Sequence, residues 1–255
     1  MKRDELTAFL DDYLRLREFA DDASNNGLQV AASGEVTRVV AGVDGCMALF
    51  EAARQEKADL VLVHHGISWG AEPRRMTGIP GARIGMLFRN DISLYAAHLP
   101  LDAHPVVGNN AQLADMMRLQ ERQSCACYHG TDIGFAGALP EAMTAAELAA
   151  MLDSQFTWTK TDTRVYNGDR RVNRVAVISG GGGELCFEAA AEQGCEAVVT
   201  GEFTHQMYHE MKESNVAVIV LGHYVSETVG VRAVLALLKE KYGIDGVFVD
   251  LPTGL

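Results

Sequence analysis

The sequence predicts an α/β protein built from two related β/α lobes that arose by internal duplication, with a small inserted α+β segment between them. Short apolar runs such as Leu60–Val63 and Val216–Leu221 alternate with stretches of helical periodicity, which is typical of parallel sheets covered by helices. The string Phe-Glu-Ala-Ala occurs at 50–53 and again at 187–190. A chain of 255 residues is long enough for one or two domains, so two lobes fit its length.

The first lobe is expected to cover residues 1–122. Apolar residues recur at helical spacing from Leu6 to Leu14, which predicts an amphipathic helix over residues 3–17. The elements after it are expected to be strands at 28–30, 38–43, 59–63 and 91–96, a helix ending near 57, and helices at 81–89 and 109–119. We interpret residues 67–80, which contain Trp69, Pro73 and Pro80, as a loop over the strand ends.

Residues 123–170 interrupt the alternation. They are rich in threonine, alanine, glycine and aspartate, and the stretch from Thr144 to Glu147 has the form of a capping box. We interpret them as the inserted α+β segment. The second lobe, 171–255, is expected to contain strands at 174–178, 196–199, 216–221 and 246–249, a helix after residue 183, and helices at 203–212 and 229–242.

The internal repeat extends to histidines and carboxylates. An offset of 137 residues, which aligns the two Phe-Glu-Ala-Ala strings, places His65 on Glu202. An offset of 125 residues aligns two further motifs. His-x-x-x-Asp, which begins at His98, aligns with His-x-x-x-Glu, which begins at His223. A chance match is the alternative, because Phe-Glu-Ala-Ala is a common helical string. Two matches in the same order favour duplication around one shared site.

Candidate metal ligands follow the predicted strands. The carboxyl ends of buried strands are where ligands bind in α/β proteins. The residues at these ends are His64, His65, His98, Asp102, Glu202, His223 and Glu227. The alternative for the His-His pair alone is a polar strand end without metal.

The donor types in this set predict two metal ions. Imidazoles and carboxylates without thiolates suit zinc, iron, manganese, nickel or cobalt. Even three of these histidines with two of these carboxylates exceed the three protein ligands usual for a catalytic zinc, and they fit two divalent ions about 3.5–4 Å apart. Such a centre would carry a local charge of about +2, which favours a small anionic substrate.

The composition indicates which binding partners and which location to expect. A formal net charge of −12 argues against a broad nucleic-acid surface and against an anionic membrane. The five cysteines show no disulfide-like spacing, which favours free thiols. The N-terminus lacks an apolar signal segment, and no run approaches the roughly 20 residues needed to span a bilayer. We therefore expect a cytoplasmic protein.

Three other polar features are weaker candidates for binding. Gly180–Gly183 could expose backbone N–H groups to a phosphate, but a tight strand-to-helix turn is favoured. His104 could orient a ligand near Asp102. His205 and His209 are spaced to share a helix face, where a solvated or packed face is favoured.

The motifs together resemble the NIF-three-like family, whose members are often called GTP cyclohydrolase 1 type 2 homologues. The resemblance rests on Val63–Gly66, His98–Pro105, Gly108–Asn110, Gly180–Gly183, Thr200–Glu202, Gly222-His223 and Glu227. It implies a dinuclear centre with the ligands His64, His65, Asp102, His223 and Glu227. Glu227 would bridge the two ions, and His98 and Glu202 would lie close by. It also implies two α/β lobes and a ring-shaped homohexamer.

Two functions follow from this centre. The first is a metal-dependent hydrolase acting on a nucleotide-like or other phosphate-bearing substrate, and GTP ring opening at C8 is one version. Glu202 is the candidate for proton transfer, and His98 is the second candidate catalytic residue. The alternative is a non-catalytic metal-binding regulator or assembly protein. The ligand count, which leaves positions open for water, favours the enzyme.

Overall fold

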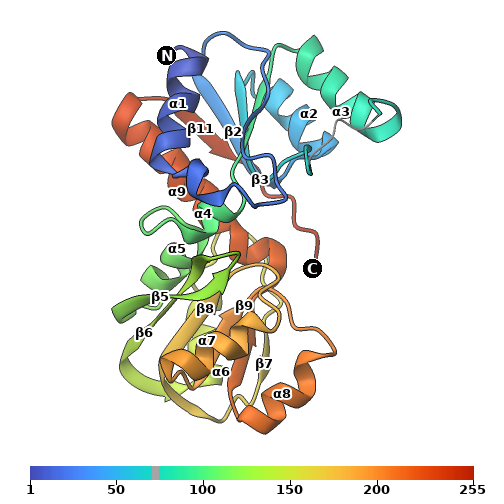
Figure 1. The fold of residues 1–255 in the computed structure, drawn as a ribbon. Helices are drawn as coiled ribbons and strands as arrows, with labels where there is room; N and C mark the ends of the chain where they lie inside the picture. Colours follow the sequence, from blue (N-terminus) through green and yellow to red (C-terminus); the bar gives the residue numbers. More distant parts are fainter. Residues whose placement is uncertain (71–74) are drawn as a thin grey trace. The chain divides into compact units, whose positions relative to one another are not determined.

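The chain folds into two compact units, seen in a computed structural model that describes residues 1–70 and 75–255 (Figure 1). The first unit comprises Met1–Leu101 and Val231–Leu251. The second comprises Asp102–Gly230 and Pro252–Leu255. Each unit contains one sheet with helices packed on it, so the predicted α/β class is confirmed.

In the part of the chain that the structure describes, the first unit contains a five-stranded sheet in the order β1-β4-β3-β2-β11. Its strands are β1 (Gly27–Val30), β2 (Arg38–Asp44), β3 (Leu60–His65), β4 (Ser93–Ala96) and β11 (Asp245–Phe248). β11, β2, β3 and β4 are parallel, and β1 runs antiparallel at the edge beside β4. Its helical segments are α1 (Arg3–Tyr13), η1 (Leu16–Phe19), α2 (Met47–Gln55), α3 (Gly78–Arg89), the start of α4 (Leu99–Ala103) and most of α9 (His223–Tyr242).

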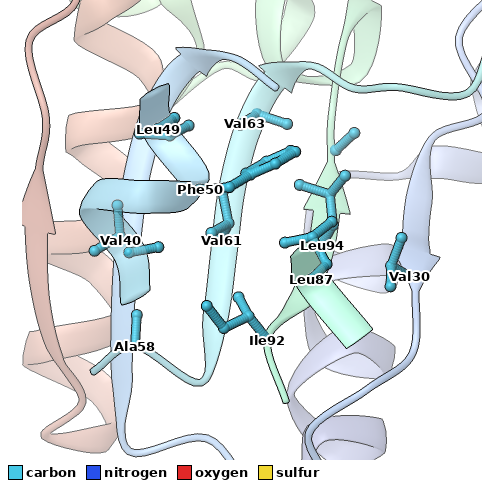
Figure 2. Close-up of a cluster of buried hydrophobic side chains, with 12 residues drawn as sticks. Val30, Val40, Leu49, Phe50, Ala58, Val61, Val63, Leu87, Ile92 and Leu94 are labelled. Carbon is cyan, nitrogen blue, oxygen red and sulfur yellow. The ribbon is translucent and has the colours of Figure 1, made fainter. Parts of the chain in front are cut away.

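Helices cover both faces of this sheet, with α2 and α3 on one side and α1 and α9 on the other (Figure 1). Figure 2 shows Leu49 and Phe50 of α2 lying over Val40 of β2 and Val61 of β3. A Cβ on Gly42 would lie 2.8 Å from both methyl carbons of Leu49, so the glycine lets α2 pack closely on β2. Burial on both faces explains why these strands appear as continuous apolar runs.

Among the described residues, the second unit contains a six-stranded sheet in the order β5-β6-β8-β9-β10-β7. Its strands are β5 (Gln120–Tyr128), β6 (Thr131–Thr144), β7 (Arg164–Tyr166), β8 (Arg171–Ile178), β9 (Ala197–Thr200) and β10 (Ala217–Val220). β8, β9 and β10 are parallel, and β7 is antiparallel to β10. Its helices are α5 (Asn109–Met116), α6 (Ala145–Asp153), α7 (Leu185–Gln193), α8 (Met207–Ser214) and the first turns of α9. The capping box predicted at Thr144 and Glu147 is present at the start of α6.

The edge strand β5 has an irregular backbone. Glu121 and Ala126 have φ angles of 49° and 61°, in the left-handed region. The pairing of β5 with β6 also shifts register between Gln120 and Gln123, so the edge is not a regular extended strand.

The two units share a strand order. The order β1-β4-β3-β2 in the first sheet corresponds to β7-β10-β9-β8 in the second, with an antiparallel edge strand beside the last of the parallel strands in each case. β3 begins at Leu60 and β9 begins at Ala197, which is the same offset of 137 residues as in the repeated string. The two related β/α lobes predicted from the repeat are therefore present.

The limits of the units differ from the expected 1–122, 123–170 and 171–255. β11 pairs with β2, which places the end of the chain's last helix and strand in the first unit. Residues 123–170 include β6, which pairs with β8 in the second sheet. Strand pairing depends on partners far away in sequence, so local patterns did not indicate it. The expected loop 67–80 is described only in part, because 71–74 lie outside the described residues, and α3 begins within it at Gly78.

No helix in the described ranges has the length and apolar character needed to cross a bilayer.

Candidate metal centre

Three histidines of the first unit lie together. His64 and His65 end β3, and His98 follows β4. The ring centroids are 4.6 Å apart for His64 and His65, 5.1 Å for His64 and His98, and 5.6 Å for His65 and His98. One ring nitrogen from each lies within 4.8 Å of the other two. His64 is buried, whereas His65 and His98 keep 20% and 23% of their side chains exposed, so the cluster is accessible to a small ion.

Each of these rings is oriented through its Nδ1 atom. Nδ1 of His64 lies 2.9 Å from the carbonyl oxygen of Ala97. A carbonyl oxygen only accepts hydrogen bonds, so this Nδ1 carries the proton, and in the neutral ring the lone pair is on Nε2. Nδ1 of His65 and His98 contact carboxylates instead, Asp44 Oδ1 at 2.9 Å and Asp22 Oδ1 at 2.8 Å. Histidines that bind metal through Nε2 commonly have such partners on the other nitrogen.

The surroundings of Asp22 stabilise its side chain in the charged form. Its side chain is 1% exposed. Besides His98, the carboxylate accepts hydrogen bonds from Ser24 N at 3.0 Å, Asn26 Nδ2 at 2.8 Å and Leu99 N at 3.1 Å. Burial raises the pKa of Asp22, but the hydrogen bonds and the interaction with His98 outweigh burial and lower the pKa below its ordinary value.

The loop after β3 is held beside this cluster. Gln29 Oε1 accepts hydrogen bonds from Ile67 N at 2.8 Å and Ser68 N at 3.1 Å. A Cβ on Gly66 would lie 2.3 Å from the same oxygen, so glycine is required for this approach. Trp69 packs against the His98 ring in a T-shaped arrangement, with centroids 5.1 Å apart. Trp69 therefore lies beside the histidine cluster and lines it on one side.

The second unit contains a cluster of one histidine and two glutamates at the start of α9. His223 Nε2 lies 3.0 Å from Glu227 Oε1, and its Nδ1 lies 2.6 Å from Glu202 Oε1. Burial lowers the pKa of His223, but hydrogen bonds and charge from Glu227 and Glu202 outweigh burial and raise the pKa to about 9. Without metal, a protonated ring therefore joins the two carboxylates. A metal ion would replace the proton on Nε2 and leave Nδ1–H on Glu202.

Glycines allow two loops to approach this group. Gly180 has a φ of +61°, and a Cβ there would lie 2.3 Å from Glu227 Oε1. A Cβ on Gly201 would lie 2.7 Å from Ser226 Oγ and 2.8 Å from the Cα of His223. Close approach to His223 and Glu227 accounts for these two glycines without a phosphate.

Asp102 is oriented by a buried polar network. Its Oδ1 accepts hydrogen bonds from Asn109 Nδ2 at 2.9 Å and Ser179 Oγ at 2.8 Å. Asn109 Oδ1 in turn accepts from Gly230 N at 2.9 Å, and Asn110 Oδ1 accepts from Ser179 N at 2.6 Å. Both asparagines are fully buried. The network therefore fixes Asp102 relative to α5, β8 and α9.

Within the described residues, the groups that could hold a metal ion do not include the remaining histidines or a cysteine. His104 Nδ1 accepts hydrogen bonds from Val106 N and Val107 N at 3.2 and 3.1 Å, so in the neutral ring its proton lies on Nε2, in contrast to His64. His205 and His209 are exposed. The five cysteines, all within the described ranges, are free. Burial raises the pKa of Cys125 and Cys186 to about 12, so these thiols stay protonated.

Sequence reasoning gave no role to the residues that orient the candidate metal ligands. They are Asp22, Asp44, Asn109 and Ser179. Asp44 pairs with His65 across β2 and β3, and the Asp-Gly turn after β2 could have indicated it. The pair Asn109-Asn110 stands at a predicted helix start and offered a similar signal. Asp22 lies in a loop with no distinguishing pattern.

The chain is similar to known proteins over its whole length. The family model Duf34/NIF3 (NGG1p interacting factor 3) matches residues 1–253. A Pyrococcus horikoshii protein named GTP cyclohydrolase 1 type 2 homolog is 40% identical over 255 residues and covers 100% of both chains. A protein of the same name from Archaeoglobus fulgidus is 42% identical and covers 98% of both chains. A crystal structure of a Thermus thermophilus protein is 38% identical, covers 100% of both chains and has a TM-score of 0.85. The chain therefore belongs to the Duf34/NIF3 family.

Proposed function

We propose that the protein binds two divalent metal ions and uses them as a hydrolase. The proposed ligands are His64, His65, Asp102, His223 and Glu227, with Glu227 bridging the ions. The observation that carries the proposal is the shared orientation of the imidazoles. His64, His65 and His223 each direct Nδ1 to an oxygen acceptor, so a metal ion would be held through Nε2. On His223 the ion would take the place of the proton that now lies between Nε2 and Glu227.

The donor set fits zinc, iron, manganese, nickel or cobalt. The groups are imidazole nitrogens and carboxylate oxygens, which these ions accept. The first unit offers imidazoles, and the second unit adds His223 together with carboxylates.

Bound divalent ions would polarise a substrate oxygen and lower the pKa of a water to about 7. The protein's own residues have separate tasks. Asp44 and the carbonyl of Ala97 hold the rings of His65 and His64. Glu202 keeps 45% of its side chain exposed, so it could exchange a proton with a substrate while it holds His223.

The substrate class follows from charge. A centre with residual positive charge favours a small anionic molecule, and we propose a nucleotide-like or other phosphate-bearing compound. Curated relatives are named GTP cyclohydrolase 1 type 2 homolog, so hydrolytic opening of a purine ring at C8 is one reaction to test. His98 is proposed as the second catalytic residue, since it lies in the same cluster.

Metal content by plasma mass spectrometry tests the proposal. We expect about two ions per chain in the wild type and fewer in His64→Ala and His223→Ala. His129→Ala is the matched control, because His129 is exposed at the turn between β5 and β6. No bound metal after incubation with manganese, iron or zinc would refute the proposal.

Turnover is tested separately from binding. Glu202→Gln keeps the side-chain oxygen near His223, so we expect retained metal and lost hydrolysis of nucleotides or phosphate esters. Metal binding without turnover of any such compound by the wild type would favour a regulator or assembly protein instead. A homohexamer and a cytoplasmic location stay predictions, and native mass spectrometry tests the former.

A further inference from the structure

The second unit contains a cavity between the C-terminal ends of α5 and α6 and the last residues of β6. Its volume is about 570 Å³, within the range of about 300–1,000 Å³ that small-molecule sites occupy in proteins. Met116 of α5 lines it, whereas Asn109, which supports Asp102, begins the same helix about 10 Å away along the axis. The cavity therefore lies at the far end of α5 from the polar network around Asp102.

An irregular stretch of β6 forms one wall of this cavity. β6 advances five positions from Ala138 to Met143, whereas the facing residues of β8 are two positions apart. The extra residues leave the regular ladder, as in a large β-bulge. Arg171 Nη2 donates a hydrogen bond to the carbonyl oxygen of Ala142 at 2.7 Å, which holds the bulge in place. Glu141 belongs to the bulge and lines the cavity.

The apolar part of the lining consists mainly of methionines. Four of the ten methionines in the chain are there: Met116, Met117, Met143 and Met151. Met117 is buried, and the other three are half-buried. Methionine side chains are flexible and polarisable, and they are frequent on surfaces that adapt to different apolar ligands. The lining therefore suits apolar groups without requiring one exact shape.

Three polar side chains of the lining have bonding capacity to spare. Gln155 Nε2 donates hydrogen bonds to the carbonyl oxygen of Met116 and to Met151 Sδ, both at 3.1 Å, so the amide is fixed in place. Among the described residues, no hydrogen bond or ion pair engages Gln155 Oε1, the guanidinium of Arg118 or the carboxylate of Glu141. A cavity that holds one cation and one anion, not paired with each other, suits a ligand that carries both charges.

We propose that this cavity binds a short apolar peptide with free termini. The peptide carboxylate pairs with Arg118, its ammonium group pairs with Glu141, and its side chains pack on the methionines. The C-terminal ends of α5 and α6 also favour the ammonium group, because the last carbonyl groups of a helix carry a partial negative charge. This site is separate from the proposed metal centre and goes beyond the proposed function.

The alternative is that the two charged residues serve only the fold. Arg118 follows the C-terminal end of α5, where a positive charge offsets the helix dipole. Glu141 would then be an ordinary exposed charge. These roles predict either no peptide binding or binding that does not depend on the charges of the peptide termini.

Isothermal titration calorimetry of the full-length chain with the dipeptide Leu-Phe tests the proposal. A chelator is present, so that the peptide does not bind through metal. We expect a dissociation constant below about 1 mM in the wild type. N-acetylated Leu-Phe and C-amidated Leu-Phe should each bind roughly two- to fivefold more weakly, because each lacks one charge at an exposed pair.

Two variants assign each terminus to its partner. In Glu141→Gln, acetylation of the peptide should no longer weaken binding, because the partner of the ammonium group is gone. In Arg118→Gln, amidation should no longer weaken it. Both side chains are exposed, so we expect both variants to fold.

Met151→Lys tests the apolar wall, and Met86→Lys is its matched control. Both methionines are half-buried on helices. Each sulfur accepts a hydrogen bond from an amide four residues later, Gln155 Nε2 at 3.1 Å and Asn90 Nδ2 at 3.2 Å. Loss of the apolar contact should weaken Leu-Phe binding at least about tenfold in Met151→Lys alone.

The outcomes decide the proposal even if Met151→Lys does not fold. No binding of Leu-Phe to the wild type would overturn it, as would equal affinities for the three peptides or an equal loss in Met86→Lys. If Met151→Lys fails to fold, the two terminus tests decide. A Met151→Lys assembly of lower mass in native mass spectrometry, with no peptide bound by the wild type, would assign this surface to a second copy of the chain instead.

Discussion

Replacing Gly180 by alanine should displace Glu227 and weaken metal binding. The new Cβ would lie 2.3 Å from Glu227 Oε1, whereas ordinary contacts begin near 3.4 Å. The carboxylate must therefore move by about 1 Å, which exceeds the roughly 0.5 Å that a preorganised site tolerates. The left-handed φ of +61° adds a cost of about 1–2 kcal/mol in stability.

Gly183→Ala separates these two effects. Gly183 has a similar φ of +55°, but among the described residues outside its chain neighbours the nearest atom to its Cβ would be Gly181 O at 3.9 Å. Both variants should lose similar stability in thermal melts with chelator present. Only Gly180→Ala should lose metal affinity in a chelator competition, by at least about tenfold. Equal affinities in the two variants would refute the role given to Gly180.

Three further predictions concern pH, the polar network and a helix cap. In the metal-free protein, His223 has a folded pKa near 9 against 6.5 for the free side chain. Its contribution, about 2 kcal/mol after allowing for solvent screening, should be complete below pH 6.5 and lost as pH rises through 9. Urea unfolding at pH 6 and 9.5 measures this, and His223→Gln showing the same loss would contradict it. Asn109→Ala removes the acceptor for Gly230 N, so it should cost roughly 1–3 kcal/mol and also lower metal affinity. An Asn109→Ala variant with unchanged stability and affinity would argue against the network. Thr144→Ala breaks the capping box with Glu147 and should cost about 1 kcal/mol, with metal content unchanged as the check.

Much of the fold could be predicted because its central strands are locally distinctive. Leu60–Val63 is buried on both faces, so the apolar run marks a strand regardless of its partners. The capping box at Thr144 is likewise a local interaction. Sequence reasoning assigned residues 246–249 to the second lobe. The pairing of β11 with β2 had no local signal, because it joins residues about 200 positions apart.

The same difference between local patterns and distant contacts applies to the candidate site. His64 and His65 could be identified because they directly follow an apolar strand. Asp22 could not, since its contact with His98 joins a loop to a strand end 76 residues away. Residues that bind a ligand are often constrained in type and spacing, whereas the residues that orient them need only reach the right place in space.

The irregular edge of the second sheet has a consequence for behaviour at high concentration. A regular edge strand offers its backbone groups to any other extended chain, which leads to aggregation. In β5, Glu121 and Ala126 have left-handed backbone conformations. The backbone N–H and C=O groups on either side of each residue therefore do not point in the regular alternating directions of a strand. An added strand could therefore pair over only a short length. We therefore expect this edge of the sheet to resist strand addition at high protein concentration.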